Sequence, residues 1–178
     1  MRHQCASLLA LFYAKSEVVR LAFTQYPLNL PGQIYGSPMP FGLYDPSDKL
    51  LLQDFKTAGM YGVGLLAELE ECREKTGRDL LAVYREEGLA VFPLPISNYG
   101  VPSTGRLADV LKQTSVHAAQ SHHILIHCSA GLGRTALIAT LLARYVLGVS
   151  GADAIDWLGR HQPGALLTPA HIYGGGSS

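Results

Sequence analysis

The chain has 178 residues, 48% of them hydrophobic, which is enough apolar material for one compact domain without stabilising disulfides or metals. Fourteen Lys and Arg residues balance fourteen Asp and Glu residues, so no overall field draws the protein to nucleic acid or to an anionic membrane, and we expect neither partner. The three cysteines, Cys5, Cys72 and Cys128, lie far apart. This argues against a disulfide framework or a zinc site and favours a reducing, cytoplasmic compartment.

The ends of the chain differ in composition from its middle. Residues 1–26 contain an apolar run without a small-x-small cleavage site, so we expect an N-terminal helical segment rather than a secretory signal. Residues 27–46 are rich in Pro, Gly and Tyr, which predicts a loop around a short strand at 33–35. We expect the catalytic domain to span residues 27–173 and the Gly- and Ser-rich residues 174–178 to form a disordered tail.

Helix and strand patterns alternate from residue 48 onward. Such alternation predicts an α/β fold of three layers, with a central, mostly parallel sheet flanked by helices. Ligands of these sheets bind beyond the carboxyl ends of the strands, and the last predicted strand ends directly before Cys128. The predicted helices span residues 48–58, 79–87, 103–120, 134–147 and 152–160, and the predicted strands span residues 61–66, 89–92 and 124–127.

The loop after the last strand has the features of an anion-binding site. It joins a buried strand to a helix N-terminus, where unpaired amides and the positive end of the helix dipole favour anions. Gly131 and Gly133 permit left-handed backbone angles, which would let successive amides surround the oxygens of a phosphate. The residues expected to bind phosphate are Ser129, Ala130, Gly131, Leu132, Gly133 and Arg134.

Four side chains in and beside this loop are candidates for catalysis. The planar guanidinium of Arg134 can bind a phosphate through two parallel hydrogen bonds. Cys128 lies in the same positive surroundings, so we expect a lowered thiol pKa and a thiolate nucleophile. Thr135 can donate to that sulfur, and we expect His127 to order the loop by hydrogen bonding rather than to act as a base. A P-loop NTPase is excluded because no Gly-Lys-Ser/Thr follows the turn.

The segment resembles the signature of the cysteine-dependent protein tyrosine phosphatase superfamily, His-Cys-x5-Arg-Ser/Thr, which His127, Cys128, Arg134 and Thr135 match. The late position of the loop and the short chain resemble the dual-specificity type, and the order of elements is similar to the cyclin-dependent kinase inhibitor 3-like group. The resemblance implies a protein tyrosine phosphatase-like fold. It also implies hydrolysis of phosphotyrosine, and of phosphoserine or phosphothreonine, on a phosphorylated protein or peptide through a cysteinyl-phosphate intermediate, with no cofactor.

One residue departs from the pattern of this superfamily. About thirty residues before the cysteine, the family carries an Asp that protonates the leaving oxygen, and Asn98 occupies that place here. A carboxamide can donate a hydrogen bond but cannot deliver a proton at neutral pH. Since general acid catalysis commonly contributes about 10²–10⁴-fold, we expect weakened turnover of phosphate monoesters.

Several explanations of Asn98 stay open at this stage. The chain can be a slow phosphatase, or a pseudophosphatase or substrate trap that binds phosphorylated targets. Its substrate can have an acidic leaving group, such as the phosphoanhydride cut by the RNA triphosphatase branch of the superfamily. Another group can replace the acid, or Asn98 can be an engineered replacement. The retained Cys128 and Arg134 favour a reduced or altered phosphatase over an inactive one.

The other titratable side chains are weaker candidates. Asp48 is expected to cap a helix and Asp109 to face solvent, while Asp45 lies in the early loop region. The adjacent His122 and His123 lack a further Cys, Asp or Glu at ligand spacing, so we predict no metal site. His171 stands where the resemblance implies a glutamine that orients the hydrolytic water.

Overall fold

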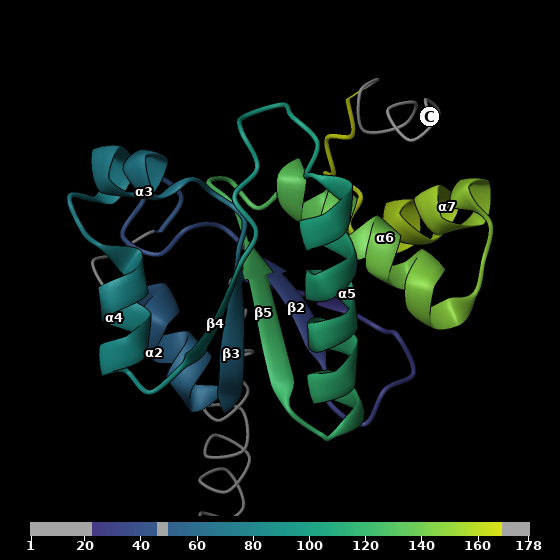
Figure 1. The fold of residues 1–178 in the computed structure, drawn as a ribbon, viewed down its shortest axis with the longest axis horizontal. Helices are drawn as coiled ribbons and strands as arrows, with labels where there is room; N and C mark the ends of the chain where they lie inside the picture. Colours follow the sequence, from purple (N-terminus) through teal and green to yellow (C-terminus); the bar gives the residue numbers. More distant parts are fainter. Residues whose placement is uncertain (1–22, 46–49, 169–178) are drawn as a thin grey trace, which may run out of the picture.

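The computed structural model describes residues 23–45 and 50–168 of the chain, and Figure 1 shows them as a central sheet between two groups of helices. The strands lie in the order β1-β2-β5-β3-β4. Strand β1 is antiparallel to β2, and all other neighbours are parallel, which confirms the predicted mostly parallel sheet. The strands are β1 (Thr24–Tyr26), β2 (Ile34–Ser37), β3 (Met60–Leu65), β4 (Ala90–Pro93) and β5 (His123–His127). The helices are α2 (Leu50–Thr57), α3 (Leu69–Thr76), α4 (Leu80–Glu86), α5 (Thr104–Ala119), α6 (Arg134–Leu147) and α7 (Gly151–His161).

The sheet separates two hydrophobic cores. Along β5, Leu125 contributes to the core under α2, α3 and α4, while Ile126 contributes to the core under α5, α6 and α7. Successive side chains of a strand point to opposite faces, so a strand covered on both faces is apolar at every position. This explains why β5 carries a continuous run of Ile, Leu and Ile, all with fully buried side chains.

Most predicted elements form close to their predicted bounds. The prediction for α6 agrees with the structure at both ends, because Gly148 takes the left-handed conformation, with φ of 67°, that commonly terminates helices. The predicted helices at 103–120 and 152–160 correspond to α5 and α7. Local periodicity was sufficient for these elements because each has a strongly apolar face.

Two elements differ from the expectation. Residues 24–26, which we assigned to a helical segment, form β1 and pair with β2, so the sheet begins before residue 27. Helix α3 was not predicted, because its sequence LEECREKT is mostly charged and Cys72 is its one buried residue. The remainder of the predicted N-terminal segment, the predicted tail, Asp48 and His171 lie outside the described residues.

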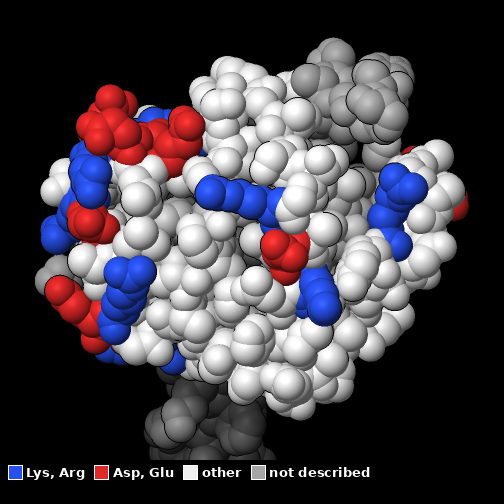
Figure 2. Space-filling view, in the orientation of Figure 1, with Lys and Arg blue, Asp and Glu red and all other residues white. Residues whose placement is uncertain are grey.

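The surface has no single dominant charge on the face seen in Figure 2, where Lys and Arg lie next to Asp and Glu. Carboxylates gather around α3, which carries Glu70 and Glu71 in its first turn. Within residues 23–45 and 50–168, every helix is too short or too polar to serve as a membrane span.

Candidate active site

The loop between β5 and α6 lies beside a pocket of about 300 Å³ at the carboxyl edge of the sheet. The pocket brings together Cys128, Arg134 and Asn98, as the sequence predicted, although Asn98 comes from the separate loop between β4 and α5. Gly131, His127 and Thr135 are not part of its lining. The lining residues are Tyr44, Lys75, Asn98, Tyr99, Cys128, Ser129, Ala130, Leu132, Gly133, Arg134, Leu166 and Thr168.

Hydrogen bonds from other parts of the domain fix the peptides of the loop. The C=O of a trans peptide and the N–H that follows it point in opposite directions. The amides of Ala130, Leu132 and Gly133 therefore point away from the groups that bind the preceding carbonyls, and all three residues line the pocket. These bonds run from Met39 N to Ser129 O at 2.9 Å, from Gln162 Nε2 to Gly131 O at 2.8 Å and from Leu166 N to Leu132 O at 2.8 Å.

The two glycines of the loop behave differently. Gly131 has φ of 76°, in the left-handed region, and a Cβ there would lie 2.6 Å from the carbonyl oxygen of Ser37. Only glycine fits this position. Gly133 has φ of −101°, so the expectation of a left-handed angle at Gly133 is wrong. Its place directly before α6 explains the difference, since the chain there already turns into the helix.

The thiol of Cys128 lies in surroundings that favour the thiolate. Burial by itself would raise the pKa of Cys128, but the hydroxyl and amide of Thr135, the charge of Arg134 and the amide of Gly131 together lower it. The hydroxyl oxygen of Thr135 is buried and makes no hydrogen bond with any described group. The hydroxyl lies close enough to the sulfur to lower the pKa of Cys128. Its proton is therefore available to the sulfur when the sulfur carries charge.

Arg134 is held by Glu71 of α3, a residue that the sequence analysis did not identify. Its Nη1 and Nη2 donate to the two carboxylate oxygens of Glu71 at 2.6 and 2.7 Å, and Nη1 also donates to the carbonyl of Ile96 at 2.9 Å. Three of the five guanidinium N–H groups are thereby used. The Nε–H and the second Nη2–H, which share one edge of the group, are not taken by Glu71 or Ile96, and this edge is within reach of Cys128. It can bind a phosphate through two parallel hydrogen bonds.

Glu71 links α3 to the loop between β5 and α6. The hydrogen bonds from Arg134 outweigh the opposing effect of burial and, with help from Lys75, lower the pKa of Glu71 to about 2. Lys75 donates to Glu71 at 2.7 Å and to the hydroxyl of Ser129 at 2.9 Å. The spacing of Glu71 and Lys75 on one helix face is visible in the sequence. Their contact with the loop is not, because Glu71 and Arg134 lie 63 residues apart.

His127 is fully buried behind the loop. Its Nδ1 lies 2.9 Å from the carbonyl oxygen of Cys128, and since a carbonyl only accepts, Nδ1 carries the proton. Its Nε2 then accepts from the hydroxyl of Tyr84 at 2.6 Å. Burial, with the nearby charge of Arg134, lowers the pKa of His127 to about 4. The imidazole is therefore neutral at pH 7, and both of its nitrogens are engaged in holding the loop.

Asn98 lies at the tip of an exposed turn. The amide of Gly100 donates to the carbonyl of Ser97 at 2.9 Å, and Tyr99 has φ of 61° while Asn98 does not have positive φ. These angles describe a type II β-turn with Tyr99 at the position that usually requires glycine or asparagine. The turn presents both side chains to the pocket.

The candidate replacement acids do not reach the pocket. Asp45 accepts a hydrogen bond from the amide of Phe41 at 2.7 Å, and Asp109 is exposed on α5. Neither belongs to the pocket lining, and no other Asp or Glu of residues 23–45 and 50–168 does. No described carboxylate is therefore placed in the pocket to act as a general acid.

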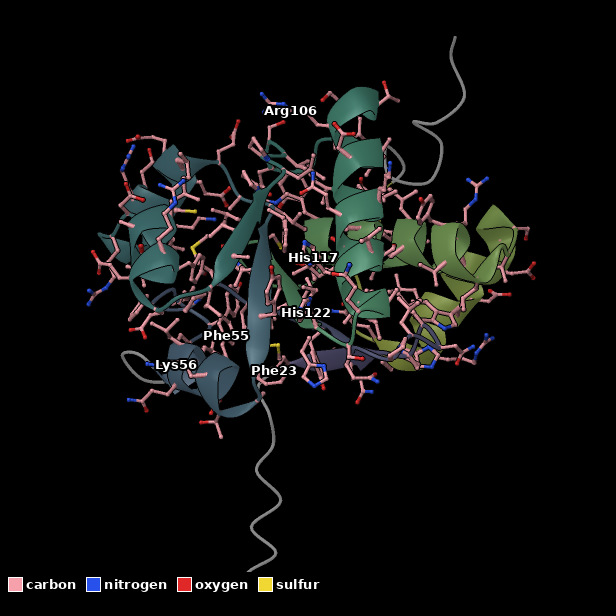
Figure 3. All side chains as sticks on the ribbon, turned by 60° about the horizontal axis from the view of Figure 1, so that its bottom comes forward. Phe23, Phe55, Lys56, Arg106, His117 and His122 are labelled. Atoms are coloured by element: carbon pink, nitrogen blue, oxygen red, sulfur yellow. The ribbon has the colours of Figure 1, made fainter. Side chains whose placement is uncertain are left out.

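His122 and His123 lie at the other end of β5, away from the pocket. His123 accepts a hydrogen bond from the amide of Gln33 at 3.0 Å. The ring of His122 stacks on Tyr61 with centroids 3.9 Å apart and lies near His117 of α5 (Figure 3). Among the described residues, no group of three or more metal-ligating side chains occurs.

A protein-family model described as "Polymorphic toxin system, DSP-PTPase phosphatase" matches residues 45–149, which is more than half of the chain. The chain belongs to this family. The matched residues include Asn98, Cys128 and Arg134, so the pocket's central residues lie inside the segment that defines the family.

Curated relatives and solved structures agree with this assignment. Cyclin-dependent kinase inhibitor 3 of Rattus norvegicus is 28% identical over 107 residues, covering 60% of this chain and 50% of the relative. The human protein of that name is 26% identical over 107 residues, with the same coverage of both chains. The chain thus spans about half the length of the curated relatives it matches. The predicted resemblance to the dual-specificity type and to this group is confirmed.

Two solved structures share the fold. Kinase associated phosphatase, solved with its catalytic-site cysteine substituted by serine, superposes with a TM-score of 0.76 at 21% identity over 84% of this chain and 89% of that chain. Tk-PTP in its active form superposes with a TM-score of 0.68 at 23% identity over 84% and 91%. The predicted protein tyrosine phosphatase-like fold is confirmed.

The first prediction concerns the thiol. Thr135→Val removes the hydroxyl near Cys128 and keeps the shape of the side chain, so the pKa of Cys128 should rise. We expect the pH at which iodoacetamide alkylation of Cys128 reaches half its maximal rate to lie below that of an ordinary thiol in the wild type and to move upward in the variant. Mass spectrometry of the Cys128 peptide measures the rate, and Thr135→Ser, which keeps the hydroxyl, is the control. Superimposable wild-type and Thr135→Val profiles would contradict the role of the hydroxyl.

The second prediction concerns Glu71. Because its folded pKa is lowered from 4.5 to about 2, its contribution to stability is present above pH 4.5 and is lost as pH falls toward 2. The difference in melting temperature between the wild type and Glu71→Gln should be largest above pH 4.5 and should narrow below it. Glu70→Gln, which changes an exposed carboxylate of the same helix, should give a small difference throughout. A wild-type to Glu71→Gln gap that is constant with pH would be evidence against the ion pair.

Proposed function

We propose that this chain hydrolyses phosphate monoesters, foremost phosphotyrosine in a phosphorylated protein or peptide, through a cysteinyl-phosphate on Cys128, and that Asn98 slows its turnover. One observation carries the proposal. The buried thiol with a lowered pKa, the second edge of Arg134 and the loop residues whose amides point away from the partners of the preceding carbonyls all lie at one pocket. A thiolate beside donors arranged for a dianion is the requirement for attack on a phosphate ester.

The proposed first step transfers the phosphoryl group to sulfur. The nonbridging oxygens accept hydrogen bonds from the loop amides and from the second edge of Arg134, which stabilises the transition state. The sulfur of Cys128 forms a bond to phosphorus while the bond from phosphorus to the ester oxygen breaks. The electron pair leaves with that oxygen. Because the carboxamide of Asn98 donates only a hydrogen bond, the oxygen takes its proton from solvent.

The proposed second step restores the enzyme. A water molecule attacks phosphorus and gives up a proton to solvent, the sulfur–phosphorus bond breaks, and inorganic phosphate leaves. The released electron pair regenerates the Cys128 thiolate, which the hydroxyl of Thr135 can stabilise as a donor. His127 takes no part in proton transfer, because its neutral ring is engaged on both nitrogens.

The rim of the pocket supports an aromatic substrate. Tyr44 and Tyr99 both line the pocket and are 55% and 71% exposed. Exposed aromatic rings can pack against the ring of phosphotyrosine, whereas phosphoserine and phosphothreonine offer them less surface. A reducing, cytoplasmic place of action is part of the proposal, because a thiol with a lowered pKa is readily oxidised.

The central test compares the wild type with Cys128→Ser on an activated aryl phosphate. We expect the wild type to release phosphate and to show a covalent phosphate adduct on Cys128 by mass spectrometry after rapid acid quench. The Cys128→Ser variant should bind phosphate but release none above background. Equal, slow release by the two proteins with equal phosphate binding would leave a phosphate-binding pseudophosphatase as the function.

Replacing Asn98 tests the explanation of slow turnover. Asn98→Asp should raise the rate of phosphotyrosine hydrolysis by roughly 10²-fold or more, the contribution usual for a general acid. The rate for 2,4-dinitrophenyl phosphate should change little, because its leaving group needs no proton. The variant should also lose activity at alkaline pH as the new acid deprotonates. Asn98→Ala serves as the control for the hydrogen bond of the carboxamide, and equal acceleration of both substrates would contradict this account.

A further inference from the structure

A buried chain of hydrogen bonds connects β1 to the phosphate-binding loop. The hydroxyl of Tyr26 donates to Gln162 Oε1 at 2.6 Å, and Gln162 Nε2 donates to the carbonyl of Gly131 at 2.8 Å. Tyr26 and Gln162 are 1% and 7% exposed. Both lie outside the matched segment 45–149, so this support of the loop comes from parts of the chain that the family model does not include.

The peptide between Gly131 and Leu132 is the one that this chain of hydrogen bonds fixes. Gly131 has a left-handed φ and no side chain, so rotation of the following peptide meets little steric resistance. A rotation by half a turn would exchange the positions of the Gly131 carbonyl and the Leu132 amide. It would place a carbonyl oxygen where a phosphate needs a donor. The hydrogen bond from Gln162 opposes that rotation, because the carbonyl keeps its partner only in the present orientation.

Tyr26 sets the direction in which the Gln162 amide points. A side-chain amide has one accepting and one donating end, and the hydroxyl of Tyr26 occupies the accepting end. Burial, with the charge of Cys128, raises the pKa of Tyr26, so this hydroxyl stays protonated. Strand β2 leaves room for it, because a Cβ on Gly36 would lie 2.5 Å from the hydroxyl oxygen.

We propose that Gln162, oriented by Tyr26, is a positioning residue that holds the Leu132 amide toward the bound phosphate. The inference rests on the proposed function, since it concerns the same phosphate site. It adds to that site two residues, Tyr26 and Gln162, that do not line the pocket. It also predicts that loss of Gln162 weakens phosphate binding but leaves the pKa of Cys128 unchanged. The Gly131 amide, which acts on Cys128, belongs to the preceding peptide and does not depend on the hydrogen bond from Gln162.

The experiment measures phosphate binding and thiol reactivity separately in Gln162→Met and Tyr26→Phe. In Gln162→Met we expect the dissociation constant for inorganic phosphate, followed by NMR titration, to rise roughly 10-fold, as for the loss of one hydrogen bond to a charged group. The shift of the Leu132 amide resonance on phosphate addition should shrink. The pH profile of Cys128 alkylation should stay at its wild-type position. Tyr26→Phe should show the same pattern to a smaller degree.

Thr140→Val is the matched control, because it removes a different buried hydrogen bond, from Thr140 to the carbonyl of Ala136 within α6. It should leave phosphate affinity unchanged. Wild-type phosphate affinity in both Gln162→Met and Tyr26→Phe, or equal weakening in Thr140→Val, would overturn the inference. If Gln162→Met does not fold, Tyr26→Phe, which keeps the ring packed near Trp157, decides the question. Because binding is measured without turnover, a wild type that binds inorganic phosphate but does not hydrolyse an aryl phosphate ester would refute the proposed function alone.

Discussion

The carbonyls of Cys128, Ser129, Gly131 and Leu132 are each bound by a group of the protein, and these bonds determine what the loop can do. Their partners come from His127, from the segment after β2, from the end of α7 and from the segment that follows it. With the carbonyls engaged, the intervening amides are left for an anion. The arrangement also depends on the sheet, because β2 lies beside β5 with Ser37 opposite His127, which brings the backbone of Ser37 against Gly131.

The second constraint is the burial of Arg134. Its side chain is 4% exposed, and a buried cation without a partner would be costly. Glu71 offsets this cost by pairing with one edge of the guanidinium, and the second edge faces Cys128. The site can therefore keep a permanent positive charge next to the thiol. That charge, the helix N-terminus and the neutral His127 form an electrostatic environment suited to a thiolate and a dianion.

Binding and proton delivery are separate parts of this site. The loop, Arg134 and Glu71 belong to β5, α6 and α3, whereas Asn98 belongs to an exposed turn between β4 and α5. The side chain of Asn98 takes part in none of the hydrogen bonds described above that hold the loop and Arg134. The left-handed φ of Tyr99 shows that the turn is held in a conformation costly for this residue type, as is common near functional sites.

The sequence by itself determined the parts of this protein that are encoded over short stretches. Apolar periodicity located α5, α6 and α7, and the contiguous segment from His127 to Thr135 predicted the loop, its candidate nucleophile and the arginine beside it. The prediction that Asn98 stands at the position of the superfamily's Asp also came from a short stretch of sequence around it. Short or mostly charged elements such as β1 and α3 were missed, since too few of their residues are buried to produce a pattern. The tertiary structure alone decided the partners of the loop. Glu71 meets Arg134 across 63 residues, Tyr84 meets His127 across 43, and Tyr26 meets Gln162 across 136. Such pairs leave no local signal, because the free energy that selects each partner arises only when the folded chain removes both groups from water.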